Sequence, residues 1–151
     1  MNPQTLNVDA DQLIRQITKK TKVIMLINVL GISTDVKKIV NFAKKKNIIV
    51  IEDNCEALGA KFQKKHLGTY GNFGTYSFFY SHQITCGEGG MIVCNNEDDY
   101  KILLSLRSHG WSRGKKVYQE NAKKYPNLDP RYIFINSGFN LRPTDIQAAI
   151  G

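Results

Sequence analysis

Two apolar runs on either side of one helical pattern constrain the fold of this chain more than any other feature. Residues 22–31 read KVIMLINVLG and residues 47–53 read NIIVIED. Such near-continuous apolar runs are typical of strands that are buried on both faces. Between them, apolar side chains recur with helical spacing at Val36, Ile39 and Ala43. A strand, a helix and a strand joined by short links form a right-handed βαβ unit, which predicts an α/β fold with a parallel sheet.

Weaker patterns before and after this unit predict the remaining elements. Residues 9–18 predict a short amphipathic helix, and Ser33 or Thr34 is expected to cap the helix of the βαβ unit. The other expected elements are strands over TYSFFY (75–80) and GGMIVCN (89–95), a helix capped by Asn95 or Asn96, a long loop over 110–135 and a helix that begins within 142–151.

The composition limits the class of protein. The chain has 151 residues, a hydrophobic content of 42% and a net charge of +8. Its basic residues are mostly lysines in scattered pairs, which is typical of a lysine-rich surface rather than of a nucleic-acid interface. No apolar run reaches the roughly 18–20 residues of a membrane helix, and the first residues do not form a secretory signal. We therefore expect a cytoplasmic protein without nucleic-acid or membrane partners, whose three cysteines are free thiols.

Polar side chains follow two of the predicted strands. Asp53 ends one apolar run, and His82 follows the run TYSFFY. Ligands bind beyond the carboxyl ends of parallel strands, so a carboxylate and an imidazole there are expected to face one crevice, with the hydroxyl groups of Ser77 and Ser81 nearby. Each residue also has a structural interpretation: Asp53 as the cap of the next turn, and His82 as a structural histidine. The segment GEGG (87–90) is neither a Walker motif nor a dinucleotide fingerprint.

Taken together, five motifs resemble one family. They are IEDNCEALGA, GTYGNFGTYSFF, SHQITCGEGGMIV, LRSHGW and GFNLRPTDIQAAIG, and the similarity runs from about residue 6 to residue 151. In order and spacing they closely resemble the nucleotide-sugar aminotransferase family (DegT/StrS), whose members are pyridoxal-phosphate (PLP) enzymes of fold type I. The resemblance implies a large domain with a mainly parallel sheet and helices on both faces. Because family members are longer, it also implies that residues 1–151 are an incomplete part of this PLP-binding domain, without the C-terminal small domain.

The resemblance assigns roles around the cofactor to four side chains. Asp53 is expected to bind the pyridine nitrogen, where a carboxylate keeps that nitrogen protonated. Glu56 is expected near the ring hydroxyl, and Ser77 at the phosphate. Asn140 resembles the asparagine that reaches the cofactor phosphate of the neighbouring subunit, so a homodimer is implied.

His82 departs from the common family pattern. Most members have at this position a lysine that binds the cofactor covalently, which an imidazole cannot do stably. The segment SHQITCGEGG resembles the pattern of the family's sugar 3-dehydratases, which carry histidine here. The resemblance therefore implies pyridoxamine phosphate (PMP) held by noncovalent contacts, a nucleotide-linked keto-sugar as substrate, and His82 as the catalytic base for loss of a 3-hydroxyl group. A nucleotide-sugar aminotransferase and a non-catalytic remnant are the alternatives.

One branch of these dehydratases adds an iron–sulfur cluster held by four cysteines. Cys55 occupies the place of the first ligand, but the residues after Trp111 contain no cysteine, and three thiols cannot supply four ligands. The branch that uses the organic cofactor alone, without a metal, is therefore expected. Cys86 and Cys94 are expected to be small buried residues.

Overall fold

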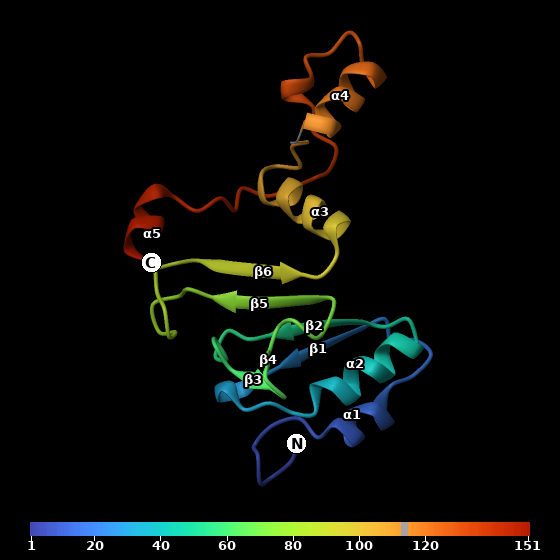
Figure 1. Cartoon of the computed structure of the whole chain (residues 1–151), viewed down its shortest axis with the longest axis vertical. Coiled ribbons are helices and arrows are strands. Elements are labelled where there is room, and N and C mark those ends of the chain that lie inside the picture. The colour runs from blue at the N-terminus through green and yellow to red at the C-terminus, as the bar shows by residue number, and fades with distance from the viewer. Residues whose placement is uncertain (113–114) are drawn as a thin grey trace. The chain divides into compact units, whose positions relative to one another are not determined.

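The structure, a computed structural model, describes residues 1–112 and 115–151. The chain divides into two compact units, residues 1–95 with 145–151 and residues 96–144. We call them unit 1 and unit 2 and describe each by itself (Figure 1). Unit 1 contains the predicted βαβ unit, and unit 2 contains most of the chain that follows the last strand.

Unit 1 is built on a 4-stranded sheet. Its strands are β1 (Val23–Ile27), β2 (Ile49–Asp53), β5 (Phe73–Ser77) and β6 (Gly90–Cys94), in the order β1-β2-β5-β6. Strand β2 is parallel to β1 and β5, and β6 is antiparallel to β5. The mainly parallel α/β sheet predicted from the sequence is therefore confirmed. The register pairs Asp53 with Ile27 on one side and with Thr75 on the other, so the carboxyl end of β2 lies between its two neighbours.

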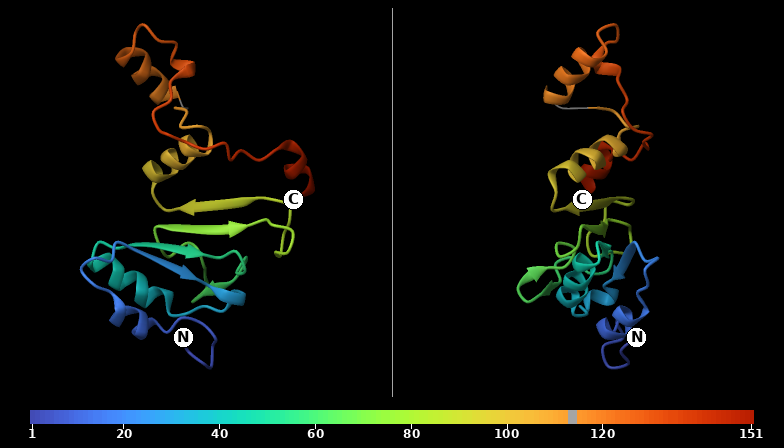
Figure 2. Two further views of the ribbon diagram at one scale, coloured as in Figure 1. Left: turned by 180° about the vertical axis from the view of Figure 1, so that it is seen from behind. Right: turned by 90° about the vertical axis from the view of Figure 1, so that its right-hand side faces the viewer.

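Two helices pack on one face of this sheet, as the views in Figure 2 show. They are α1 (Ala10–Gln16) and α2 (Val36–Lys45). Asp35 caps α2, because its carboxylate accepts a hydrogen bond from the Lys38 N–H at 3.0 Å. The prediction that Ser33 or Thr34 caps this helix is wrong. The Ser33 hydroxyl donates to the Thr34 carbonyl, and the Thr34 hydroxyl donates to the Val8 carbonyl.

The hydrophobic core of unit 1 lies between these helices and the sheet. It includes Ile24, Leu26, Val36, Ile39, Ala43, Val50 and Leu67, all of which are buried. Along β1 the buried side chains alternate with exposed ones, since Val23, Met25 and Ile27 are exposed. The prediction that the apolar runs are buried on both faces is therefore wrong for the part of the chain that the structure describes, where one face of β1 is covered.

A buried glutamate organises the connection between β2 and β5. This connection contains a short antiparallel hairpin of β3 (Lys61–Phe62) and β4 (Lys65–His66). After the hairpin, the fully buried Glu52 carboxylate accepts hydrogen bonds from three backbone N–H groups at 2.6 to 2.7 Å. The donors belong to Gly68, Tyr70 and Gly71. We call residues 67–72 the Glu52 turn.

Glycine at two positions lets β5 approach this turn. A Cβ on Gly74 would lie 2.1 Å from the carbonyl oxygen of Gly68, and Gly68 itself has a positive φ of 86°. A side chain at Gly74 would force the two backbone segments apart, and one at Gly68 would collide with the side chains of Tyr76 and Asn54. The glycine-rich sequence between residues 68 and 74 is thus explained by the close approach of two backbone segments.

Unit 2 begins with a capped helix. Its elements are α3 (Glu97–Arg107), α4 (Lys115–Lys124) and the short 3-10 helix η2 (Pro130–Tyr132). Asn96 caps α3, accepting hydrogen bonds from the N–H groups of Asp98 at 2.8 Å and Asp99 at 3.0 Å. This cap is one of the two that the sequence predicts.

The prediction of a long loop over residues 110–135 is wrong, because this range contains α4; residues 113–114 lie outside the described part of the chain. Polar contacts attach α4 to the rest of unit 2. The buried Asn121 amide donates to the Ser112 hydroxyl at 2.8 Å, and that hydroxyl donates to the Ile133 carbonyl at 3.0 Å. An attachment of this kind leaves no apolar stripe in the sequence.

Candidate functional site

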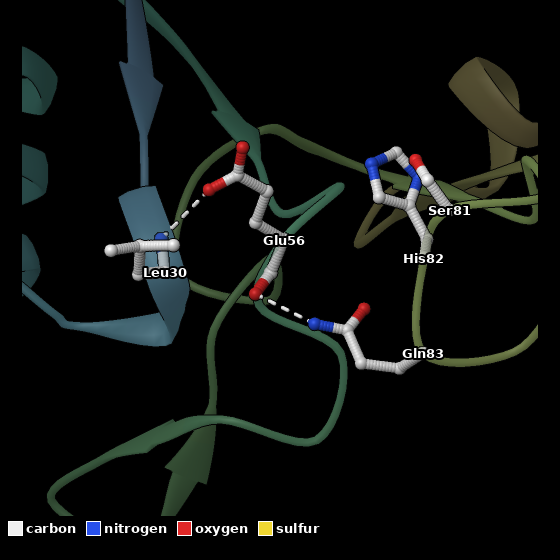
Figure 3. Close-up of a pocket in the computed structure, with 5 residues that line it drawn as sticks. All are labelled: Leu30, Glu56, Ser81, His82 and Gln83. Carbon is white, nitrogen blue, oxygen red and sulfur yellow. Dashed lines mark hydrogen bonds between the residues drawn. The ribbon is translucent and has the colours of Figure 1, made fainter.

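A pocket of about 470 Å³ lies in unit 1 beyond the carboxyl ends of the parallel strands (Figure 3). Its lining residues are Leu30, Glu56, Ser81, His82 and Gln83. They come from the chain segments that follow β1, β2 and β5. Pockets that bind small ligands typically measure roughly 300–1,000 Å³ and occupy this edge of an open parallel sheet.

The segment after β1 is shaped to meet the segment after β2. It forms the 3-10 turn η1 (Val29–Gly31), in which Leu30 and Gly31 both have left-handed backbones with φ of 53° and 73°. This turn directs the Leu30 N–H to the Glu56 carboxylate, which accepts it at 2.9 Å. A residue without glycine's freedom adopts this conformation only when its surroundings hold it there. The Leu30–Glu56 bond is one such restraint.

Glu56 connects the first segment to the third. Its side chain accepts from the Leu30 N–H, and its backbone carbonyl accepts from the Gln83 amide Nε2 at 2.9 Å. Both bonds are drawn in Figure 3. The Glu56 side chain is exposed and lines the pocket. Glu56 therefore helps to hold the pocket together and also presents a carboxylate to it.

His82 lies on the other side of the pocket from Glu56 in Figure 3. Its backbone N–H donates to the Phe79 carbonyl at 3.1 Å, and its ring meets the Phe79 ring edge-on at a centroid distance of 6.0 Å. The Nδ1 atom is buried and has no hydrogen-bond partner among the described residues. Buried polar atoms are nearly always paired, so Nδ1 lacks the partner that a buried nitrogen normally has, while the residue as a whole lines the pocket.

The position of His82 differs from the prediction in one respect. The apolar run was expected to be a strand up to Tyr80, but β5 ends at Ser77. The backbone then closes a loop, because the Phe78 carbonyl accepts from the Cys86 N–H at 3.1 Å. We call residues 78–89 the pocket loop. His82 therefore lies within a loop and not directly at a strand end.

Asp53 and Ser77 lie at the carboxyl ends of the neighbouring strands β2 and β5. The Asp53 carboxylate is half-buried and accepts from the Cys55 N–H at 3.0 Å, with the Thr75 hydroxyl at 3.5 Å. It thus stabilises the next turn, as one of its two interpretations predicts. The Ser77 hydroxyl accepts from the Phe79 N–H at 3.2 Å. Glu56 faces His82 from the other side of the pocket, whereas the sequence predicts Asp53 in that place.

Asn140 belongs to unit 2. It is exposed and pairs with Ser108 in an isolated antiparallel bridge, where the Leu141 N–H also donates to the Arg107 carbonyl at 3.0 Å. This bridge fixes the backbone of the GFNLRPTD motif against the end of α3. The role of Asn140 at a cofactor phosphate stays a prediction.

Sequence reasoning missed Glu52 and Gln83. Alternation along β2 places Glu52 on the core face with Val50, and a carboxylate on such a face requires several hydrogen-bond donors. Burial, and after it the Glu52 charge, raises the pKa of the Tyr76 hydroxyl. Gln83 carries no comparable sequence signal, because its partner is the backbone carbonyl of Glu56.

In residues 1–112 and 115–151, no three His, Cys, Asp or Glu side chains lie close enough together to hold a metal ion. In the same part of the chain, every helix is too short or too polar for a membrane span. Cys55, Cys86 and Cys94 are free thiols and half-buried. Burial, and after it the hydrogen bond and charge of Asp53, raises the pKa of Cys55 to about 11, so this thiol is protonated at neutral pH.

The chain is similar to characterised nucleotide-sugar enzymes over nearly its whole length. It is 39% identical over 153 residues to GDP-4-keto-6-deoxy-D-mannose 3-dehydratase from Yersinia pseudotuberculosis. The alignment covers 100% of this chain and 39% of that relative. The chain is 40% identical over 152 residues to GDP-perosamine synthase from Caulobacter vibrioides, which covers 99% of this chain and 36% of that relative. The chain thus spans less than two fifths of the length of these relatives.

Solved structures share its fold. A variant of GDP-4-keto-6-deoxymannose-3-dehydratase with bound GDP-perosamine matches with a TM-score of 0.83 and 38% identity, over 97% of this chain and 38% of that one. The E. coli 3-dehydratase with bound hydrated PLP matches with a TM-score of 0.80 and 35% identity, over 99% and 39%. An aminotransferase from Psychrobacter cryohalolentis matches with a TM-score of 0.84 and 30% identity, over 99% and 37%.

These matches confirm the fold and the resemblance that the five sequence motifs indicate. The family assignment covers every residue of the chain, from residue 1 to residue 151. This chain belongs to the DegT/DnrJ/EryC1/StrS aminotransferase family.

Proposed function

We propose that this chain forms part of a nucleotide-sugar 3-dehydratase that uses PMP or PLP in deoxysugar biosynthesis. The observation that carries the proposal is His82, an imidazole that lines the pocket on the side opposite Glu56. In the family that this chain resembles, most members have at this position a lysine that binds the cofactor covalently. An imidazole does not form this covalent bond, so the side chain of His82 can act in proton transfer. Two relatives that are 39% and 41% identical to this chain are GDP-4-keto-6-deoxy-D-mannose 3-dehydratases.

The residues assigned to the cofactor fit a pyridine ring that carries a phosphate. The Asp53 carboxylate is half-buried at the edge of the sheet, where it would pair with a protonated ring nitrogen. The Ser77 hydroxyl lies at the end of the adjacent strand and would contact the phosphate, and the Glu56 carboxylate would lie near the ring hydroxyl. When bound, the cofactor supplies an electron sink that stabilises a carbanion. Asn140 would contact the cofactor phosphate of a second subunit.

His82 acts as the base in this proposal. Imidazoles accept and return protons near neutral pH. One ring nitrogen of His82 points toward the Glu56 side of the pocket (Figure 3), and the edge-on contact with Phe79 keeps the ring in place. The nitrogen on the Glu56 side would take a proton from carbon, and His82 would return a proton to the departing 3-hydroxyl group, which would leave as water. The half-buried position of the ring limits competing exchange with solvent.

An aminotransferase is the second candidate. The 40% identity with GDP-perosamine synthase lies between the 39% and 41% identities with two dehydratases, so overall similarity does not separate the two reactions. The residue at position 82 does separate them, because transamination in this family depends on a lysine there. A non-catalytic remnant is the third candidate. The exposed apolar face of β1, with Val23, Met25 and Ile27, supports it.

The proposal extends to the longer protein. Its substrate would be a nucleotide-linked keto-sugar, in keeping with the GDP-perosamine bound to a similar dehydratase. Residues 1–151 would form part of the PLP-binding large domain of a cytoplasmic homodimer, and a small domain would follow. The chain's coverage of only 39% and 36% of the length of two relatives supports the view that it is one part of a longer protein.

An absorbance titration of the purified chain with PMP and PLP tests the proposal. We expect the wild type and the surface variant Asp11→Asn to bind PMP. We expect Asp53→Asn to bind at least about tenfold more weakly, because a hydrogen bond between charged groups contributes roughly 1.5–3 kcal/mol. Absence of PMP binding by the wild type, or equal affinity in Asp53→Asn, would contradict the assignment of the cofactor site.

A further inference from the structure

Two side-chain hydrogen bonds attach the pocket loop to the rest of unit 1. At the β6 end, the Gln147 amide donates to the Glu88 carbonyl at 2.7 Å. In the middle of the loop, beside the pocket, the Gln83 amide donates to the Glu56 carbonyl at 2.9 Å. This second bond joins residues that are 27 positions apart in the chain. It comes from the residue that directly follows His82.

The acceptor of this bond is a fixed point. The Ala57 N–H donates to the Asn54 carbonyl at 2.9 Å, and Ala57 is buried in the core. The Glu56 side chain is held in turn by the Leu30 N–H. The Glu56 carbonyl therefore belongs to the rigid edge of the sheet. Through its hydrogen bond to this carbonyl, the exposed Gln83 side chain attaches the pocket loop to this edge.

His82 depends on where the pocket loop is held. The ring of its aromatic neighbour Phe79, which lies edge-on to the imidazole, belongs to the same loop. Its backbone N–H also bonds within the loop, to the Phe79 carbonyl. An exposed loop of this kind needs an external anchor to keep one internal conformation, and the contact between His82 and Phe79 persists only while it does. The Gln83 amide supplies such an anchor one residue away from the imidazole.

We propose that Gln83 is a positioning residue for His82, acting through its hydrogen bond to the Glu56 carbonyl. The inference rests on the proposed function, in which His82 moves a proton at a defined point of the pocket. The bond requires a donor, because a backbone carbonyl only accepts. Glutamate has the same shape but presents only acceptors when ionised, and methionine has similar length without a polar group. Gln83→Glu and Gln83→Met therefore remove the bond in two independent ways.

The test uses NMR of the isotope-labelled chain without any ligand. The readout is the cross-peak between the ring protons of His82 and Phe79. We expect Gln83→Glu and Gln83→Met both to lose this cross-peak. The matched control Ile84→Val, on the neighbouring exposed residue of the same loop, should keep it. The amide signals of β1 and β2 should stay in place in all three variants.

Three results would overturn the inference. The first is a cross-peak that persists in Gln83→Glu or in Gln83→Met. The second is its loss in the Ile84→Val control. The third is a loss that is accompanied by equal changes throughout β1 and β2, because Gln83 would then support the whole fold and not His82.

A PMP titration of the same samples keeps the inference and the proposed function apart. Where PMP binds, the shift of the His82 ring signals on binding should be smaller in both Gln83 variants than in the wild type. A chain that loses the cross-peak in both variants but binds no PMP would contradict the proposed function and leave the anchoring role of Gln83 standing.

Discussion

The Glu52 turn and the pocket loop are held to the same sheet in opposite ways. In the Glu52 turn, a fully buried carboxylate accepts three backbone hydrogen bonds. In the pocket loop, the exposed amide of Gln83 makes one neutral bond to a carbonyl. Buried bonds to an ionised group are strong and costly to break, whereas exposed neutral bonds contribute little to stability. The first arrangement therefore stabilises the fold, and the second determines where a side chain lies.

The largest expected effect is on the Glu52 turn. Glu52→Leu leaves three N–H groups without their acceptor, and each unsatisfied buried donor costs about 1–3 kcal/mol. We expect a loss of at least about 3 kcal/mol in the free energy of unfolding, measured in urea. The matched control is Glu56→Gln, which keeps an acceptor for the Leu30 N–H. A stability of Glu52→Leu close to that of this control would contradict the role of the turn.

The next effect is expected at Asp53, the neighbour of Glu52, and is measured as the alkylation rate of Cys55. The pKa of Cys55 is raised to about 11, first by burial and then by Asp53. A raised thiol pKa means less thiolate at any pH below it, so alkylation of Cys55 at pH 8 should be about 100-fold slower than in the urea-unfolded chain. Asp53→Asn removes the charge, lowers this pKa and should speed alkylation.

Peptide mass spectrometry after iodoacetamide treatment at several pH values measures both rates. The rate at Cys55 should keep rising as the pH approaches 11. An equal rate in the folded and unfolded chains would show that Cys55 is not shielded, and no change in Asp53→Asn would assign the shift to burial alone.

A smaller effect is expected in β5, the strand from which Tyr76 reaches the Glu52 turn. The Tyr76 hydroxyl donates to the Leu67 carbonyl at 2.5 Å inside the core. Tyr76→Phe should lower the free energy of unfolding by about 1–2 kcal/mol, because the buried carbonyl loses its donor. Thermal unfolding measures this change. Unchanged stability would mean that the turn depends on Glu52 alone.

The smallest effect is expected at the pocket loop. Gln83→Met should change the free energy of unfolding by no more than about 0.5 kcal/mol, since the side chain is exposed and the bond is neutral. Urea unfolding of this variant, run beside Glu52→Leu, compares the two anchors directly. A loss as large as that of Glu52→Leu would remove the distinction between them.

The fold follows from the sequence where apolar side chains recur with a period. Val36, Ile39 and Ala43 predict α2, and all three are buried in the core. Helix α4 was missed because Asn121 attaches it through a polar contact to Ser112. The exposed face of β1 was missed because a run of apolar letters is the same whether one or two faces are covered.

Less of the candidate site than of the fold could be predicted from the sequence. His82 and Glu56 could be singled out by the family motifs, and the structure places both on one pocket. The end of β5 at Ser77 could not be read from an aromatic run that continues to Tyr80. Gln83 could not be read either, because its contact to a main-chain carbonyl 27 residues away has no sequence pattern.

The measurement that tests the central claim most directly compares the wild type with His82→Lys after incubation with PLP and reduction with borohydride. Intact mass and peptide mapping then locate any covalent cofactor. We predict an adduct at position 82 in His82→Lys and none at position 82 in the wild type. An adduct in neither protein, although PLP binds both, would show that position 82 does not face the cofactor and would contradict the account.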